Sequence, residues 1–568
     1  MLREYLLPTD EAFNHTRKSH YAGFEHQPAN TISNTTHRSF ASLFRELDAA
    51  GLFLYDIVQA GGKTVSKTYV TRTLVGEPGI TYKYLGTRIF AHPWEGRCLQ
   101  GPRGKELAGS DDGGLWRGGV ARAQERLRKA GVPSTLAAAG KLNKWMVARA
   151  ATAATAAPES CAATRGSCNF NLALINCMDS GLKGLKPEPL HNMGTCSVSW
   201  HADSCLEDYS TIGVYHCTKP EAGKEWRIAM RCSDKDGPEG EAASGAPPMV
   251  MPLASGDLYM LLGNFNHNRE HAVLTGKTSL RYSSTHRVSV VEGNTYQEMA
   301  KSASEVLDSN PTTPAALQQQ QAIMTELETE WICQFYEKGQ IHAEVHTWWH
   351  GPIMHLCQLW SQLNDWTEKC IERHCSAGPS TPGISSKTFK VLMRCLEERQ
   401  QQRVKRQERV ASSAFARMPE GLRPVDPPLC MSGPQAIKRL AADIKRLRSS
   451  YGSHCNGNNL TARSVAAGAQ SNWDALKRKQ SSSSSVEATM PAGPLLRGKN
   501  QSHDHVGAVA GKRKKGAAGP KTSGAQDKTG QGEGPRRKKQ RSAPSPGSSD
   551  LAGLQPKKWK KNNRKVAK

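Results

Sequence analysis

The sequence predicts an α+β protein: a jelly roll (double-stranded β-helix), then an α-helical domain, then a disordered basic tail. Three observations support this order. Short strands separated by turn residues dominate residues 169–291, a helical period takes over in 314–453, and a Ser/Gly/Ala/Lys-rich composition begins near residue 456. Because 568 residues exceed what one core supports, several domains are expected. The predicted boundaries are an N-terminal segment 1–39, a jelly roll 40–305, a helical domain 306–455 and a tail 456–568.

The region ahead of the strands opens with a predicted helix. Residues 42–58, SLFRELDAAGLFLYDIV, have helical spacing that ends near a glycine, and 67–75, KTYVTRTLV, follow as a β-branched alternating run. Two stretches have the composition of insertions: a Gly-rich one near 99–120 and an Ala/Thr low-complexity one near 148–168.

Eight short strands are predicted between residues 169 and 291. Their spacing, and the turn residues between them, are typical of an all-β sandwich or a jelly roll. The predicted strands are FNLALINCM, CSVSWHA, TIGVYHC, EWRIAMRC, DLYMLL, HAVLT, SLRYSS and HRVSVV.

The helical region carries aromatic and cysteine clusters whose simplest interpretation is packing. Four tryptophans are expected in a core or at a domain interface, and not stacked on bases: Trp348, Trp349, Trp360 and Trp366. Cys370, His374 and Cys375, in CIERHC, could suggest zinc. A second C-x-x-C half is missing and the segment has a helical pattern, so buried thiols are expected instead.

The net charge is concentrated in the tail. From Tyr451 to Lys568 there are 24 Lys and Arg against 6 Asp and Glu, a net +18, which leaves +7 of the chain's +25 for the first 450 residues. GKRKKG at 511–516 and GPRRKKQR at 534–541 are typical of nuclear import signals; a nonspecific solubility or RNA-tethering tail is the alternative. The tail therefore predicts a nuclear protein that contacts the import machinery, with a cytoplasmic pool also allowed.

The start of the chain and its cysteines predict a reducing intracellular compartment. MLREYLLPTDEAFNH mixes acids into any apolar stretch and does not resemble a secretory signal. No run of about 18 apolar residues is present, so no membrane contact is expected. The 15 cysteines are scattered without paired spacing, as expected of free thiols.

The first candidate site is SVSWHADSC, residues 197–205, in which His201 and Asp203 stand two positions apart. Alone, such a pair favours two polar loop residues; a third ligand on a later strand would favour a metal site. His267 and His271, in NFNHNREHAVL, compete for that place. His271 directly precedes the apolar strand AVLT, whereas His267 lies among Asn residues in a turn, so His271 is preferred.

Arg281 and Arg287, in RYSSTHR, complete the pattern. Two histidines and one carboxylate on one face of octahedral Fe(II) leave three positions open, two for a 2-oxo acid and one for dioxygen. The far carboxylate of 2-oxoglutarate then needs a planar bidentate cation, which arginine supplies better than lysine. Hydroxyl donors are expected beside it from Ser283, Thr285 and Tyr259. The whole pattern favours an iron site.

Six segments, in order along the chain, carry a family resemblance: GEPGITYKYLGTRIF, NMGTCSVSWHADSCLEDYS, GDLYML, YSSTHRV, EWICQFYEKG and TWWHGPIMHLCQLW. They resemble the FTO family of AlkB-related Fe(II)/2-oxoglutarate dioxygenases, which remove methyl groups from nucleobases in RNA. The resemblance runs from roughly Leu47 to Pro428 and includes the helical domain.

The resemblance implies three groups of site residues. The implied iron ligands are His201, Asp203 and His271. The implied 2-oxoglutarate contacts are Asn171, Tyr259, Arg281, Ser283, Thr285 and Arg287. The implied methylated-base pocket comprises Arg72, Tyr84, Leu85, Val198, Ser199 and Trp200. An aromatic lid, an apolar floor and one arginine donor suit a flat base removed from its stack.

Four positions in these motifs bear on base recognition. From the residues alone, Tyr82 and Tyr84 read as strand packing, and only the resemblance reverses this for Tyr84. Ala202 and Ser204 stand where the family has a histidine and a glutamate. If the family reads the base through the glutamate side chain, base preference differs in this chain; if it uses the backbone N–H, serine preserves it.

The resemblance implies oxidative demethylation of N6-methyladenosine in RNA, in which the N-methyl carbon is hydroxylated and formaldehyde is lost. One alternative keeps this chemistry with 3-methylthymine, 3-methyluracil or a DNA substrate, so single-stranded DNA stands beside RNA as an expected partner. The other is a noncatalytic RNA-binding protein whose tail and basic helices carry the activity. An intact ligand triad with both arginines weighs against the last, since a binding module needs none of the five.

Overall fold

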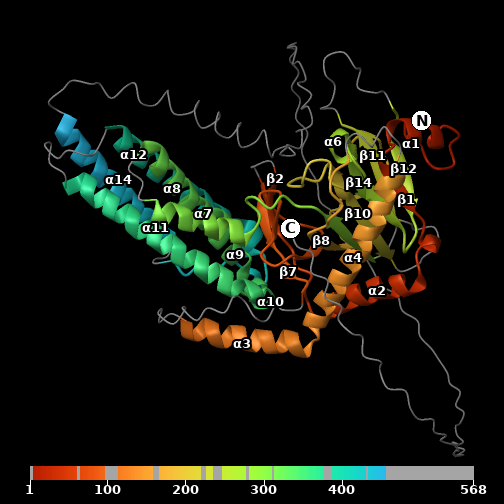
Figure 1. Cartoon of the computed structure of the whole chain (residues 1–568), viewed down its shortest axis with the longest axis horizontal. Coiled ribbons are helices and arrows are strands. Elements are labelled where there is room, and N and C mark those ends of the chain that lie inside the picture. The colour runs from red at the N-terminus through yellow and green to blue at the C-terminus, as the bar shows by residue number, and fades with distance from the viewer. Residues whose placement is uncertain are drawn as a thin grey trace, which may run out of the picture. The chain divides into compact units, whose positions relative to one another are not determined.

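The computed structural model of the chain is shown in Figure 1. All residues that it describes belong to one compact unit, Met1–Ala492. The predicted disordered tail with its basic clusters, and residues 99–112 of the Gly-rich insertion predicted near 99–120, lie outside the described residues. The described residues are 4–60, 64–95, 113–157, 165–218, 226–233, 246–276, 280–309, 313–376, 386–429 and 433–455.

A seven-stranded sheet forms one wall of the jelly roll, in the order β1-β13-β10-β15-β8-β4-β7. Its neighbours are antiparallel except for β4 and β7. The edge strand β1 falls inside the predicted N-terminal segment 1–39, so the structure places part of that segment in the sheet. The strands are β1 (Phe24–Gln27), β13 (Leu258–Leu261), β10 (Ile212–Thr218), β15 (Leu280–Arg287), β8 (Leu172–Asp179), β4 (Thr71–Gly76) and β7 (His92–Pro93).

A four-stranded antiparallel sheet forms the facing wall, in the order β12-β11-β14-β9. Ile212 and Val214 of β10 pack against Ile228 and Met230 of β11, and all four are buried, so the core lies between the two sheets. The predicted fold class is confirmed. The strands are β12 (Met249–Leu253), β11 (Trp226–Cys232), β14 (Arg269–Leu274) and β9 (Cys196–His201), and the one-turn helix α6 (Phe265–Asn268) precedes β14.

Two hairpins stand apart from these sheets. One joins β2 (Ile57–Ala60) to β3 (Thr64–Lys67), and the other joins β5 (Thr81–Tyr84) to β6 (Thr87–Phe90). The β5–β6 turn consists of Leu85 and Gly86, both with positive φ (47° and 74°), as a two-residue type I′ turn requires. A leucine at positive φ is strained, so its presence points to a constraint on this turn beyond folding.

The helices α2 and α4 cover the outer face of the large sheet (Figure 1). The Phe40 ring of α2 stacks on Tyr215 of β10 at 3.9 Å, and Met146 of α4 joins the same buried cluster. The helix predicted within 42–58 is α2, which begins earlier, behind the Ser33 cap, whose Oγ accepts a hydrogen bond from the Thr36 N–H; residues 57–60 form β2 instead. The helices are α1 (Phe13–His20), η1 (Ala29–Thr31), α2 (Asn34–Ala49), α3 (Gly113–Lys129) and α4 (Val132–Ala156).

The Ala/Thr-rich stretch predicted as an insertion near 148–168 is a packed helix over its first half. Residues 148–156 continue α4, and Ala150 and Ala153 are buried in the main hydrophobic cluster. Alanine has the highest helix propensity and fits a close helix–sheet contact, so a composition that resembles low complexity forms a packed helix here.

Helices dominate the described part of the predicted helical domain 306–455, and the first of them, α7, begins earlier, at Tyr296 inside the predicted jelly roll 40–305. Trp348, Trp349 and Trp360 are buried in the main hydrophobic cluster and Trp366 packs against a second one, which confirms their packing role. The helices are α7 (Tyr296–Asp308), α8 (Pro314–Glu326), the π-helix η2 (Leu327–Ile332), α9 (Cys333–Glu337), α10 (Gly339–Val345), η3 (Thr347–Trp349), α11 (His350–Ser376), α12 (Ser386–Val410), α13 (Ser413–Ala416), η4 (Glu420–Leu422) and α14 (Gly433–Cys455).

Two further expectations concern metals and membranes. Cys370 and His374 are buried, and the His374 Nδ1 hydrogen-bonds the Cys370 carbonyl oxygen at 2.7 Å. The expected buried thiol is thus confirmed for Cys370, whereas Cys375 is only half-buried. No helix in the described part of the chain combines the length and apolar character needed to cross a membrane.

Candidate active site

Adjacent strands of the small sheet bring His201, Asp203 and His271 together. His201 ends β9 and lies opposite His271 of β14, with ring centroids 4.2 Å apart, and Asp203 follows two residues after β9. The His201 Nε2 lies 3.8 Å from the Asp203 Oδ1. One ligand atom from each of the three lies within 4.8 Å of the others, and among the described residues no other group of His, Cys, Asp or Glu meets this condition.

Hydrogen bonds fix the orientation of the first two ligands. The His201 Nδ1 donates to the Ser199 carbonyl oxygen at 2.8 Å, which leaves the Nε2 lone pair free for a metal. Asn266 holds the loop: its Oδ1 accepts from the Asp203 N–H at 2.9 Å, and its Nδ2 donates to the Asp203 carbonyl oxygen at 2.8 Å. The rival His267 lies apart, with a side chain 40% exposed and 4.0 Å from Asp208.

The charge states suit metal binding. Burial lowers the pKa of His271 to about 3, and His201 beside it acts in the same direction, so the imidazole is neutral at pH 7. Burial alone would raise the pKa of Asp203, but Arg287 above all, together with the two histidines, holds it below its ordinary value. His271 and Asp203 are therefore unprotonated, as metal ligands must be.

Strand alternation on β15 places the predicted carboxylate-binding residues on one face. Arg281, Ser283, Thr285 and Arg287 alternate along β15, and Ser283 lies opposite His216 of β10. All four are buried.

Arg281 is held by protein contacts that leave part of its guanidinium unused. Its Nε donates to the His216 Nδ1 at 2.6 Å, and its Nη1 contacts the Met178 sulfur at 3.0 Å. The side chain of Tyr259 also hydrogen-bonds Arg281, and the charge of Asp203 acts on the same phenol. Among the described residues the buried Arg281 Nη2 has no hydrogen-bond partner. A buried, unpaired guanidinium N–H is an energetic cost that a carboxylate ligand would relieve.

Two other predicted co-substrate contacts are engaged within the protein. Arg287 donates to both oxygens of Asp203, from Nε at 2.9 Å and from Nη2 at 2.8 Å, so it grips the metal-ligand carboxylate; its buried Nη1 has no partner among the described residues. The amide of Asn171 accepts from the Ser289 N–H and donates to the Ser289 carbonyl oxygen, each at 2.8 Å. The Nη1 of Arg287 therefore remains able to donate to a ligand. The amide oxygen and nitrogen of Asn171 both hydrogen-bond the backbone of Ser289, just after β15.

The predicted base pocket is assembled in part. The Arg72 guanidinium of β4 lies 4.1 Å over the Tyr84 ring, and Leu85 beside it is 37% exposed. Across β8, Arg72 lies opposite Asn176, which in turn lies opposite Ser283, so Arg72 shares the sheet face of the carboxylate-binding residues.

The segment before His201 divides between two faces. Val198 packs at the edge of a small cluster with Val273, whereas Trp200 packs with Ala272 in a separate cluster and donates from Nε1 to Glu188 at 2.6 Å. The register of β9 against β14 shifts between Val198 and His201, which lie opposite Val273 and His271, and Trp200 packs with Ala272, which points to the other face. The Trp200 ring therefore lies away from His201, and the structure does not bring its side chain to the predicted pocket. Ser199 contributes through its carbonyl oxygen, as described above.

Sequence reasoning missed His216, Asn266 and Asn176. His216 and Asn176 occupy the same face as Ser283 on neighbouring strands, a register that one sequence does not reveal. Asn266, in the turn before β14, adjoins the competing His267 and has no motif of its own.

The residues present fit Fe(II) and a dicarboxylic 2-oxo acid. Two histidines and one carboxylate form the facial donor set that suits non-haem Fe(II). On the facing sheet, Arg281 and Arg287 each have, among the described residues, an unpartnered N–H group that can donate to a carboxylate of the 2-oxo acid.

Comparison with known proteins places this site in a family. The family model of the FTO catalytic domain matches residues 11–290, and that of the FTO C-terminal domain matches 284–449. A Xenopus laevis protein named alpha-ketoglutarate-dependent dioxygenase FTO is 29% identical over 398 residues, which cover 65% of this chain and 77% of that protein. A crystal structure of JOX2 with 2OG, Fe and JA aligns at 8% identity over 50% of this chain and 72% of that chain, with a TM-score of 0.23, too low to support any statement. Since the two family models together span residues 11–449, the chain belongs to the FTO family.

Proposed function

We propose that this protein is an Fe(II)- and 2-oxoglutarate-dependent dioxygenase that demethylates nucleobases by oxidation. One observation carries the proposal: the His201–Asp203–His271 donor set is hydrogen-bonded through Asp203 to Arg287 of β15, the strand on which the buried Arg281 has an unpartnered Nη2 among the described residues. A noncatalytic binding module has no use for this combination.

The chain's own groups hold and orient the cofactors. His201, Asp203 and His271 bind Fe(II), and Arg281 with Tyr259 receives the far carboxylate of 2-oxoglutarate. Arg287, gripping Asp203 through two N–H groups, keeps that carboxylate pointed at the metal. When bound, iron and 2-oxoglutarate together activate dioxygen, one oxygen atom of which enters the N-methyl carbon while 2-oxoglutarate becomes succinate and CO2. The hydroxymethyl product then loses formaldehyde.

The proposed substrate is N6-methyladenosine in RNA. The stacked Arg72–Tyr84 pair beside the exposed Leu85 supports this proposal, because it offers an aromatic face, a guanidinium donor and an apolar edge to a flipped base. The same features accept other N-methylated bases, such as 3-methyluracil in RNA or 3-methylthymine in single-stranded DNA. The proposed place of action is the nucleus, reached through the two basic clusters of the tail.

A substrate panel tests the function. The purified full chain, supplied with Fe(II) and 2-oxoglutarate, is incubated with single-stranded RNA and DNA oligonucleotides that each carry one methylated base, and methyl loss is read by mass spectrometry. Demethylation of the N6-methyladenosine RNA is expected, and it should disappear in His201→Ala and persist in His267→Ala. If no methylated oligonucleotide loses its methyl group, the proposed function is wrong. If a different base is preferred, the proposed function stands and the proposed substrate is wrong.

A further inference from the structure

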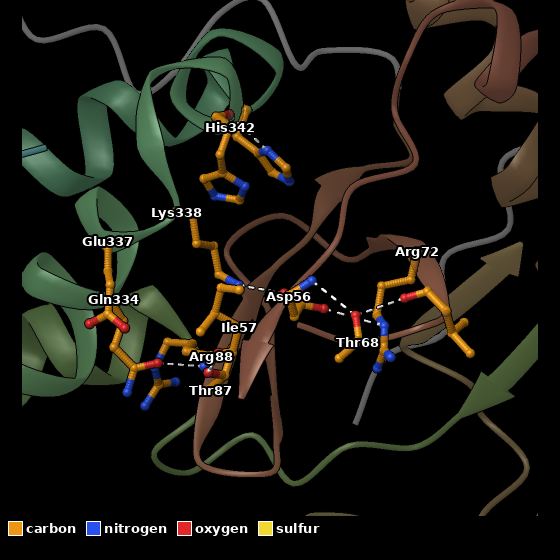
Figure 2. A network of polar contacts seen from close by, with 12 residues as sticks. Asp56, Ile57, Thr68, Arg72, Thr87, Arg88, Gln334, Glu337, Lys338 and His342 are labelled. Atoms are coloured by element: carbon orange, nitrogen blue, oxygen red, sulfur yellow. Dashed lines mark hydrogen bonds and ion pairs between the residues drawn. The ribbon is translucent and has the colours of Figure 1, made fainter. Parts of the chain in front are cut away.

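A lysine of the helical domain reaches the strands that carry the proposed base pocket (Figure 2). Lys338 stands between α9 and α10, and its Nζ lies 2.7 Å from the Asp56 Oδ1. Both side chains are largely removed from water, 13% and 7% exposed, so their ion pair is not a solvent-screened surface contact.

Asp56 stands between two cations and is hydrogen-bonded to one of them. Its Oδ2 lies 3.3 Å from the Arg72 Nε, but among the described residues neither atom has a hydrogen-bond partner, so the approach is misaligned. Burial raises the pKa of Asp56, yet Lys338 and, less strongly, Arg72 keep it below its ordinary value. Lys338 is therefore the stronger partner of the carboxylate.

Hydrogen bonds hold the backbones of Asp56 and Arg72 in place, so we expect the Asp56 carboxylate to be the group that reorients. The Asp56 N–H donates to the Thr68 Oγ1 at 3.1 Å, and the Thr68 N–H donates to the Asp56 carbonyl oxygen at 2.9 Å. Arg72 and Leu54 exchange two backbone hydrogen bonds of 2.9 and 3.1 Å. A cavity of about 20 Å³, room for one water molecule, lies against Asp56, Arg72 and Lys338 and leaves the carboxylate space to turn.

Without Lys338, Asp56 has one cation left to pair with. A carboxylate and a guanidinium at this distance close into a bidentate pair when nothing competes for the carboxylate. Such a pair would occupy the Arg72 N–H groups and draw the guanidinium from its position 4.1 Å over Tyr84. The base would then lose its arginine donor.

We propose that Lys338 is a positioning residue for the base-reading arginine: by holding Oδ1 of Asp56, it prevents that carboxylate from closing on Arg72, which stays stacked on Tyr84 with its donors open. This inference rests on the proposed function, because it takes the Arg72–Tyr84 pair as the place where the methylated base binds. It makes the helical domain a determinant of base affinity through one named contact.

The competing explanation is that Lys338 only joins the two domains. Arg409 provides a control, because it also crosses this interface: its Nη2 donates to the Ile57 carbonyl oxygen at 3.0 Å and to the Thr87 Oγ1 at 3.1 Å, while its Nε lies 2.7 Å from the Glu337 Oε1 of the helical domain. It reaches neither Asp56 nor Arg72 in any of these contacts. If interface strength is all that matters, Arg409→Met and Lys338→Met should have the same effect.

The test uses the full chain and two readouts. The first is the Kd of a fluorescein-labelled single-stranded RNA with one N6-methyladenosine, measured by anisotropy without iron. The second is steady-state turnover, which gives kcat and separate KM values for that RNA and for 2-oxoglutarate. The variants are Lys338→Met, Lys338→Arg, Arg409→Met and the double variant Lys338→Met with Asp56→Asn. Lys338→Gln replaces Lys338→Met if the latter does not fold.

Lys338→Met should raise both the Kd and the KM for the RNA about fivefold or more, the scale of one charge-assisted contact, while the KM for 2-oxoglutarate stays unchanged. Lys338→Arg and Arg409→Met should resemble the parent. Adding Asp56→Asn to Lys338→Met should restore RNA affinity, because the amide no longer captures Arg72. A purely structural defect would not be repaired by a second replacement.

Other outcomes would contradict the inference about Lys338, the proposed function, or both. The inference is overturned if Lys338→Met binds as the parent does, if Arg409→Met weakens binding equally, or if Asp56→Asn fails to restore binding. A parent protein that binds the methylated RNA without demethylating it overturns the proposed function, while the Kd comparison still judges Lys338. A parent that binds no methylated oligonucleotide overturns both.

Discussion

Acid should weaken this fold through a buried histidine where the jelly roll meets the helical domain. His92 of β7 is 4% exposed and stacks on His346 at a centroid distance of 4.2 Å. Burial lowers the pKa of His92 to about 4. The folded state therefore favours the neutral ring, and the unfolded chain binds a proton more readily. Stability is complete above the unfolded pKa of about 6.5 and is lost as pH falls from there toward about 4.

The size of the loss follows from these two pKa values. At pH 5 the unfolded chain gains about 2.1 kcal/mol from protonating this histidine and the folded chain almost nothing, so the free energy of unfolding falls by about 2 kcal/mol. Near pH 5.5 the slope is about 1.2 kcal/mol per pH unit, since nearly one extra proton binds on unfolding. His342 and His346 have pKa values lowered mainly by burial and act in the same direction.

Urea unfolding of the iron-free protein at pH 7.5, 6.0, 5.5 and 5.0 measures this slope. His92→Gln removes the titrating group and should flatten the dependence by about 1 kcal/mol per pH unit near pH 5.5, whatever it does to stability at pH 7.5. His15→Gln, at an exposed histidine of α1, is the matched control and should leave the slope unchanged. Equal slopes for the parent and His92→Gln would show that this site is not desolvated and would refute the reasoning.

Four shorter predictions concern the site and the tail. Arg281→Lys should raise the KM for 2-oxoglutarate about tenfold or more in succinate-release assays, because a point charge cannot reproduce a bidentate contact; an unchanged KM would remove Arg281 from the site. His216→Leu should weaken 2-oxoglutarate binding in calorimetry by a smaller factor, since it removes the acceptor of the Arg281 Nε. Arg72→Ala should reduce turnover of methylated RNA with the KM for 2-oxoglutarate nearly unchanged, and equal loss of both would assign Arg72 to the fold. Deleting 457–568 should leave turnover of a short oligonucleotide unchanged, move the protein out of the nucleus in microscopy, and flatten the salt dependence of binding to long RNA.

The cofactor end of the site could be predicted from sequence because its spacing is local. Arg281, Ser283, Thr285 and Arg287 are every second residue of one strand, so a strand prediction already places them on one face. His201 and Asp203 are close in sequence, and His271 was separated from His267 by the apolar strand that follows it. The sequence does not show that β9 pairs with β14, which places His271 opposite His201. The predicted jelly roll nevertheless implied that the two ligand-bearing strands lie close together.

The base end could not be predicted in the same way. Lys338 and Asp56 are 282 residues apart, and nothing in either local sequence indicates the other. Trp200 was assigned to the pocket by its position before His201, but the register shift in β9 places its ring with Ala272 on the other face, where Glu188 accepts its N–H. The packing of the Ala/Thr stretch could not be predicted for another reason. Its composition indicates low complexity, whereas the burial of Ala150 and Ala153 depends on contacts with residues far along the chain.

The proposed cofactor end and the proposed base end of the site also differ in what holds them in place. The proposed iron and 2-oxoglutarate contacts lie on or next to strands of the two jelly-roll sheets, and Arg72 of the proposed base pocket lies on β4 of the larger one. The β5–β6 hairpin, which carries Tyr84 and Leu85, is outside those sheets and is pinned by the helical domain. The Arg88 Nε of β6 donates to the Glu330 carbonyl oxygen at 2.8 Å, and the Arg88 N–H donates to Gln334. Substitutions in the helical domain should therefore change which bases bind while 2-oxoglutarate affinity stays constant, and substitutions in β15 should do the reverse.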